Sequence, residues 1–192
     1  MVKGGEKMEK GPKYRKALKD APGYEIVFQF TGRKRECLMG LWDARAGKWA
    51  LETIYSNMAE DRFTLTDGTS RFLLHTTRKL DTGEYRFGCF EPGKGWMAGG
   101  EHQHVERILI FPRQDGQVET FWLWVYDELA HRHSYRHRIY DGQDRLAGSF
   151  VSHHEAAQPY EEIDYQQVGG RMVFGLRKNG RTVFDKSFTS AQ

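Results

Sequence analysis

Cysteine and proline are scarce in this chain, and long apolar runs are absent. It has 2 Cys and 5 Pro among 192 residues, and two cysteines are too few for the disulfide framework of a small secreted domain. Cys37 and Cys89 lie inside apolar stretches and not in a spaced metal-binding motif, so we expect a reducing, cytoplasmic setting. No apolar stretch approaches the roughly 18 residues of a membrane-spanning helix. The sequence therefore predicts neither a membrane span nor a secretory signal.

The chain also lacks a strong charge of either sign. Its 29 Lys and Arg residues and 26 Asp and Glu residues give a formal net charge of +3. Basic and acidic residues are interspersed along most of the sequence, whereas a nucleic-acid surface is usually marked by clustered positive charge. We therefore expect no nucleic-acid partner and no membrane partner.

Glycine and aromatic residues are abundant instead. The chain has 21 Gly and an aromatic content of 14%, which is typical of a turn-rich soluble fold with large side chains in its interior. Its length predicts one domain, which we place over residues 13–192 behind a flexible tail, residues 1–12. Within residues 13–20, Tyr14, Ala17 and Leu18 recur at helical spacing, which predicts a short N-terminal helix.

From Tyr24 onward the apolar residues recur with a period of two, as in strands with one buried face. The predicted strands lie near residues 24–30, 37–43, 48–57, 63–66, 71–80, 84–90, 104–111, 117–126, 133–140, 147–153, 160–167, 171–177 and 181–188. Turn dipeptides such as Asp67-Gly68, Asp141-Gly142 and Asn179-Gly180 separate them, which is typical of hairpins. The sequence therefore predicts an all-β fold built from a single antiparallel meander.

A twisted sheet of that many strands tends to close or to split, and we expect it to close into a β-barrel of about eight to ten strands. In layout, with a short helix ahead of a meander, the chain resembles the calycins, the group of the lipocalins and fatty-acid-binding proteins. The resemblance implies a barrel that can enclose one small ligand. Trp42 and Trp49 lie outside the Gly-x-Trp pattern of many lipocalins, so no residue roles carry over.

Residues 121–140, FWLWVYDELAHRHSYRHRIY, form the strongest candidate for a ligand site. A run of large apolar residues, 121–126, leads into a predicted turn at Asp127-Glu128, and alternate residues of the next strand share a face. That parity predicts one wall formed, if the register aligns, by Trp122, Trp124, Tyr126, His131, His133, Tyr135 and His137. We expect His133 and His137 to exchange protons as general acid or base, and Tyr135 to donate a hydrogen bond to a developing oxyanion.

Further candidate contacts lie outside this stretch. Residues 91–100, EPGKGWMAGG, interrupt the strand pattern and predict either a lid that carries Trp96 over the barrel mouth or a plain surface loop. Arg136 faces away from the histidines and either is solvated or clamps a carboxylate or phosphate. His102 and His104 are expected to line the pocket, and two histidines at i and i+2 on a strand can also share a metal ion.

Two functions from different classes fit these residues. The first is an enzyme that needs no organic cofactor, of the isomerase, cyclase or lyase type, with His and Tyr moving protons on a hydrophobic or aromatic substrate. The second is a non-catalytic carrier or sensor of a hydrophobic ligand. A His-ligated metal or haem site is a further alternative, and a second protomer in a homodimer could cover the apolar face in place of a ligand.

Overall fold

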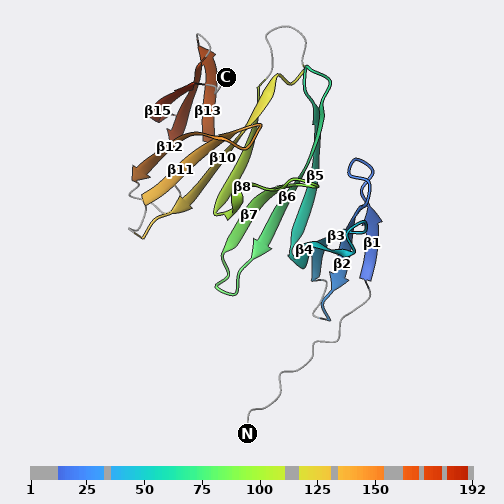
Figure 1. Cartoon of the computed structure of the whole chain (residues 1–192). Coiled ribbons are helices and arrows are strands. Elements are labelled where there is room, and N and C mark those ends of the chain that lie inside the picture. Colours follow the sequence, from blue (N-terminus) through green and yellow to red (C-terminus); the bar gives the residue numbers. More distant parts are fainter. Residues whose placement is uncertain are drawn as a thin grey trace. The chain divides into compact units, whose positions relative to one another are not determined.

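Strands make up most of the described part of the chain, as the period of two in the sequence predicts. The computed structural model describes residues 13–32, 36–110, 117–130, 134–153, 162–168, 171–178 and 181–189 (Figure 1). Fifteen strands lie in this described part, and none of its residues is helical. Consequently, it contains no helix long and apolar enough to cross a membrane.

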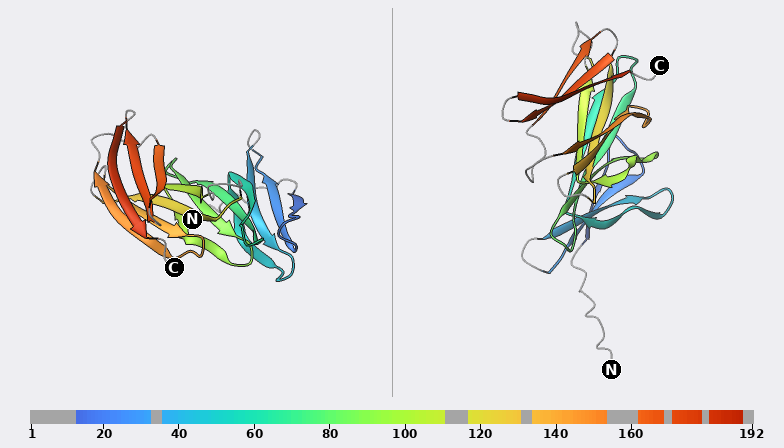
Figure 2. Two further views of the ribbon diagram at one scale, coloured as in Figure 1. Left: turned by 90° about the horizontal axis from the view of Figure 1, so that it is seen from above. Right: turned by 90° about the vertical axis from the view of Figure 1, so that its left-hand side faces the viewer.

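The described strands form four antiparallel sheets. The first contains β1 (Lys13–Ala17), β2 (Tyr24–Phe30), β3 (Cys37–Asp43) and β4 (Lys48–Tyr55). The second contains β5 (Asn57–Thr64), β6 (Ser70–Lys79), β7 (Tyr85–Glu91) and β8 (Gly95–His102). The third contains β9 (His104–Ile110), β10 (Thr120–Glu128), β11 (Ser134–Asp141) and β12 (Leu146–His153). The fourth contains β13 (Glu162–Val168), β14 (Arg171–Lys178) and β15 (Arg181–Thr189), which lie side by side in both views of Figure 2.

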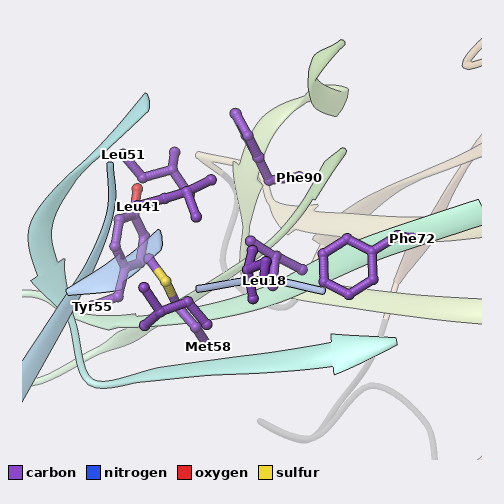
Figure 3. Packing of buried hydrophobic residues seen from close by; sticks show 9 residues of the cluster. Leu18, Leu41, Leu51, Tyr55, Met58, Phe72 and Phe90 are labelled. Carbon is purple, nitrogen blue, oxygen red and sulfur yellow. The ribbon is translucent and has the colours of Figure 1, made fainter. Parts of the chain in front are cut away.

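The chain divides into two units. Unit 1 comprises Met1–Phe63 and Ser70–Met97, and unit 2 comprises Thr64–Thr69 and Ala98–Gln192. The core of unit 1 is a cluster of large apolar side chains drawn from β2 to β7 and from the segment after β1 (Figure 3). Its buried members are Leu18, Ile26, Leu41, Leu51, Tyr55, Met58, Phe72, Leu74 and Phe90. Whether the two units fold as one domain, as the length of the chain indicates, stays a prediction.

The core of unit 2 includes β10, one of the two inner strands of its sheet. Both faces of this strand are buried, because Phe121, Leu123 and Val125 are each 0% exposed on one side while Trp122 and Trp124 are 2% and 3% exposed on the other. A near-continuous apolar run such as residues 121–126 is typical of a strand buried on both faces. Neighbouring strands β9 and β11 pair with β10 along most of its length.

Turn chemistry sets the hairpins where the sequence predicted them. Asp43 Oδ1 accepts hydrogen bonds from the backbone N–H groups of Arg45 (3.0 Å) and Ala46 (2.9 Å) in the turn between β3 and β4. Asp141 Oδ1 likewise accepts from the backbone of Gln143 and Arg145, both at 2.9 Å, between β11 and β12. An Asp side chain that bonds the amides just after it stabilises such turns.

The expected helix at residues 13–20 is wrong. Lys13–Ala17 form β1, which pairs with β2 in the register Lys13↔Gln29 to Ala17↔Glu25. The residues of β1 whose burial is described, Tyr14 to Ala17, are all exposed. An edge strand is held by backbone pairing and needs no apolar stripe, so the sparse apolar spacing of this segment misled the helical interpretation.

The expected barrel closure is also absent from the described part of the chain. Each of the four sheets has two different edge strands, so none of them closes on itself. The all-β, antiparallel part of the prediction is confirmed.

Residues 91–100 do not form a lid or a surface loop. Lys94 N–H donates to the Glu91 carbonyl at 3.0 Å in a tight turn, and β8 then pairs with β7. Trp96 packs edge-on against Phe90 at 5.4 Å between ring centroids, over the bare backbone of Gly88. The glycines of this segment made it look like a loop, but positive φ angles at Gly93, Gly95, Gly99 and Gly100 fit a turn and an irregular strand.

Candidate functional site

The register of unit 2 gathers five ring side chains on one face of β9, β10 and β11. Tyr126 of β10 lies opposite His137 on one neighbouring strand and opposite His104 on the other. Trp124 and Tyr135 lie on the same face, since they are two residues along their strands from Tyr126 and His137. We call these five residues the ring cluster.

Tyr126 is at the centre of the ring cluster. The imidazole of His104 stacks on it with 4.6 Å between centroids and an interplanar angle of 11°. Tyr135 meets it edge-on at 5.6 Å and 84°, and His137 lies at 5.3 Å. Such stacked and edge-on geometries are the favourable ones for aromatic pairs.

A hydrogen bond between Trp124 and His137 fixes the tautomer of the histidine. The indole Nε1–H donates to His137 Nδ1 at 3.0 Å. Because an indole nitrogen can only donate, Nδ1 must be unprotonated, and the proton of the neutral imidazole then sits on Nε2. The two ring planes are 11° apart, which suits a bond in the plane of both rings, and His137 is 0% exposed.

Both phenols of the ring cluster are held in the protonated form. Burial, followed by the charges of Tyr135 and Glu106, raises the pKa of Tyr126 from 10.0 to about 12. Burial and the Glu128 carboxylate also raise the pKa of Tyr135. At neutral pH each hydroxyl is therefore a hydrogen-bond donor and not a base.

The open edge of the ring cluster is at His104. Its side chain is 32% exposed, and that of Glu106, two residues further along β9, is 42% exposed. His104 Nε2 lies 3.5 Å from Glu106 Oε2 and makes no hydrogen bond within the described part of the chain. An imidazole and a carboxylate thus stand beside the Tyr126 ring where solvent reaches it.

The opposite face of the same sheet carries a charged group of three residues, which we call the Asp127 triad. Asp127 Oδ2 accepts from His102 Nδ1 at 2.7 Å and from Arg138 Nη2 at 2.8 Å. Its other oxygen accepts from the Gln103 backbone N–H at 3.0 Å. His102 Nε2 contacts the carbonyl oxygen of Ala98 at 3.1 Å, so both imidazole nitrogens face acceptors.

The Asp127 carboxylate is stabilised in its charged form. Burial alone would raise its pKa, but the hydrogen bonds from His102 and the Gln103 amide, with the charges of His102 and Arg138, lower the pKa of Asp127 below 3.8. A carboxylate held by an arginine, an imidazole and an amide is a stable structural element. It links β8, β10 and β11.

His102 and His104 do not share a site, contrary to the sequence-based expectation. His102 bonds Asp127, whereas His104 stacks on Tyr126. Asp127 and Tyr126 are adjacent in β10, so their side chains point to opposite faces of the sheet. The cause is Gln103, which lies outside both β8 and β9 and interrupts the alternation. The two imidazoles therefore do not converge as two ligands of one metal ion would, and the described residues include no group of at least three His, Cys, Asp or Glu with a metal-binding arrangement.

The remaining predicted residues are dispersed. Trp122 shares the face of Trp124 and is buried, whereas Arg136 is exposed opposite Asp127 on the other face. Trp96 belongs to unit 1. His131 and His133 lie outside the described residues.

Sequence reasoning missed the Asp127 triad because Asp127-Glu128 was interpreted as a turn, while β10 continues to Glu128. The signal that could have identified it is the alternation of Asp127 with Val125 and Leu123.

No protein-family model, curated protein or solved structure matches this chain.

Proposed function

We propose that the ring cluster binds a small, flat molecule with an apolar or aromatic body and a hydrogen-bond acceptor at one end. The observation that carries the proposal is the stack of His104 on Tyr126, which is open to solvent at His104. An aromatic body would extend this stack, and the Tyr126 hydroxyl, kept protonated by its raised pKa, would donate to the acceptor.

The chemistry of the ring cluster favours a carrier or sensor over an enzyme. Catalytic proton transfer needs a base, but Nδ1 of His137 is already bonded to Trp124, and both phenols are protonated. The imidazole of His104, whose Nε2 makes no hydrogen bond among the described residues, is the one base left in the cluster, and the other four rings offer hydrogen-bond donors and aromatic faces. These recognise a ligand and do not abstract a proton from it.

A cofactor-independent isomerase, cyclase or lyase is the second candidate. One observation favours it: Tyr135 and His137 flank Tyr126 on one face, and a phenol beside an imidazole that carries its proton on Nε2 can stabilise a developing oxyanion. In this reading His133 or His104 would supply the base. The carrier and the enzyme differ in whether the bound molecule is changed.

The test uses 2-naphthoate as the probe, because it has a flat apolar body and a carboxylate acceptor. We expect saturable binding by calorimetry, with quenching of tryptophan fluorescence. Tyr126→Phe, which keeps the ring and removes only the donor, should weaken binding by roughly tenfold or more, since hydrogen bonds to charged groups contribute about 1.5–3 kcal/mol. His104→Ala should weaken it as well, because half of the stack is lost.

Trp42→Phe is the matched control, since it removes an indole that packs on Trp49 in unit 1 and should leave the affinity unchanged. Equal affinities of the wild type, Tyr126→Phe and His104→Ala would refute the proposed site, as would the absence of saturable binding. Native mass spectrometry of the purified protein separates the two candidates. A carrier releases its co-purified molecule unchanged after incubation, and an enzyme converts it.

A further inference from the structure

A cavity of about 530 Å³ lies in unit 1, apart from the residues of the proposed function. It opens between the segment after β1, the turn that follows β3, the start of β6 and the end of β7. Its apolar surface comes from Pro22, Tyr24, Phe72 and Pro92. Phe72 belongs to the core cluster of this unit, where it lies close to Leu18 in Figure 3. Cavities of this size hold small organic molecules, whose apolar parts lie on such rings.

One wall of the cavity includes the Glu91 carboxylate, which two cationic side chains already hold. Glu91 lines the cavity and receives two hydrogen bonds from Arg71, at 3.0 Å and 2.5 Å, and an ion pair from Lys94 at 2.9 Å. Both Arg71 and Glu91 are buried. Because both carboxylate oxygens are engaged, Glu91 gives the cavity a fixed shape and no free charge for a ligand.

Three other charged side chains of the cavity, those of Asp20, Asp43 and Arg45, are exposed or half-buried. Asp43 uses Oδ1 for the amides of its turn, and Asp20 uses Oδ1 for Arg62 at 2.7 Å. Among the described residues, the second oxygen of each carboxylate has no hydrogen-bond partner, and neither has the guanidinium of Arg45. All three side chains line the cavity. A negative and a positive group are thus both open to a ligand.

Gly23 leaves room for the Arg45 side chain. A Cβ atom at Gly23 would lie 2.6 Å from Arg45 Nε and 2.9 Å from Arg45 Cδ, so the arginine passes through the space that a side chain at residue 23 would fill. Gly23 also has a φ of +93°, which strongly favours glycine. The backbone of the same turn is closed by a 2.8 Å hydrogen bond from Ala44 N–H to the Gly23 carbonyl.

We propose that this cavity binds a free α-amino acid with an aromatic or aliphatic side chain. The ammonium group pairs with Asp43 and Asp20, the carboxylate pairs with Arg45, and the side chain packs on Tyr24 and Phe72. A zwitterion matches the site because it satisfies a cationic and an anionic group at once, whereas a simple amine or a simple acid leaves one of them unpaired. The inference is independent of the ring cluster.

The test is calorimetry of the full chain with L-phenylalanine and with two analogues that each lack one charge. Phenylalaninamide keeps the ammonium and loses the carboxylate, and N-acetylphenylalanine keeps the carboxylate and loses the ammonium. We expect L-phenylalanine to bind saturably and each analogue to bind at least about tenfold more weakly, because each loses a charge-assisted contact.

Two variants assign the charges to residues. Arg45→Gln should weaken L-phenylalanine by about tenfold or more and leave phenylalaninamide unchanged. Asp43→Asn should weaken L-phenylalanine and leave N-acetylphenylalanine unchanged. Asn keeps an oxygen for the two turn amides, so the hairpin is preserved. Lys48→Gln is the control for net charge, since Lys48 is exposed near this turn but does not line the cavity.

Each other outcome overturns the proposal. No saturable binding of L-phenylalanine refutes the ligand class. If phenylalaninamide binds as tightly as L-phenylalanine, the cavity is a site for amines. If N-acetylphenylalanine binds as tightly as L-phenylalanine, the cavity is a site for anions. If Asp43→Asn does not fold, the analogue series on the wild type still decides.

Discussion

Trp124→Phe tests the hydrogen bond that fixes His137. The variant keeps an aromatic ring on β10 but removes the N–H that reaches His137 Nδ1 at 3.0 Å. Both residues are buried, at 3% and 0% exposure, so water cannot replace the donor. An acceptor left unsatisfied in this way costs about 1–3 kcal/mol, and the space left by the smaller ring adds about 1 kcal/mol. We expect a loss of roughly 2–4 kcal/mol in the free energy of unfolding.

The assay is urea denaturation followed by circular dichroism, arranged as a double-mutant cycle with His137→Leu. In the double variant both polar partners are gone, so no unpaired acceptor remains and the combined loss should be smaller than the sum of the single losses by about 1–2 kcal/mol. His137→Leu combined with Trp42→Phe, a tryptophan of unit 1, should be additive. Additivity within about 0.5 kcal/mol for the first pair would refute the hydrogen bond and the tautomer assigned from it.

Three further predictions concern other parts of the chain. Gly88→Ala should lower the free energy of unfolding by about 1–3 kcal/mol, because the added Cβ would lie 2.3 Å from Trp96 Cζ3. An unchanged melting temperature would contradict the packing of Trp96 on Gly88. Tyr126 has a pKa of about 12 in the folded state against its usual 10.0, so the folded state keeps this proton to a higher pH than the unfolded state does. The free energy of unfolding should therefore fall from pH 10 to 12. Thermal melts at alkaline pH should show a smaller fall for Tyr126→Phe. The folded pKa of Asp127 is lowered from 3.8, so its contribution is present above that value and is lost as the pH falls through the folded pKa. Asp127→Asn should therefore flatten the acid limb of the stability curve, and an unaltered limb would count against the Asp127 triad.

Residue parity in the sequence predicted part of the site because alternation along a strand needs no knowledge of the rest of the fold. Tyr135 and His137 had to share a face once β11 was recognised, and so did Trp124 and Tyr126 on β10. Their meeting depended on the pairing Tyr126↔His137, which two separate alternating patterns do not specify. The sequence likewise does not specify the pairing of Tyr126 with His104 on β9.

The errors arose where neighbouring strands determine the structure. Segment 13–17 is a strand because β2 supplies its backbone partners, whereas its own residues carry no strand pattern. The predicted strand at 48–57 is broken at Ser56, whose N–H and hydroxyl both donate to the Thr77 carbonyl, at 2.8 Å and 3.1 Å. A contact with a residue so distant in sequence leaves no local pattern.

The position of Gln103 between β8 and β9 restricts how the length of this protein can change during evolution. Insertions and deletions in hairpin connections usually leave the faces of the flanking strands alone. Here the loss of one residue would join β8 directly to β9 at His102 and His104, although each histidine must still reach its own partner, Asp127 or Tyr126. The backbone of Gln103 also bonds Asp127, and its side chain bonds the Glu128 backbone. Homologous chains that keep both histidines should therefore keep the one-residue spacing between them, even where the amino acid at position 103 differs.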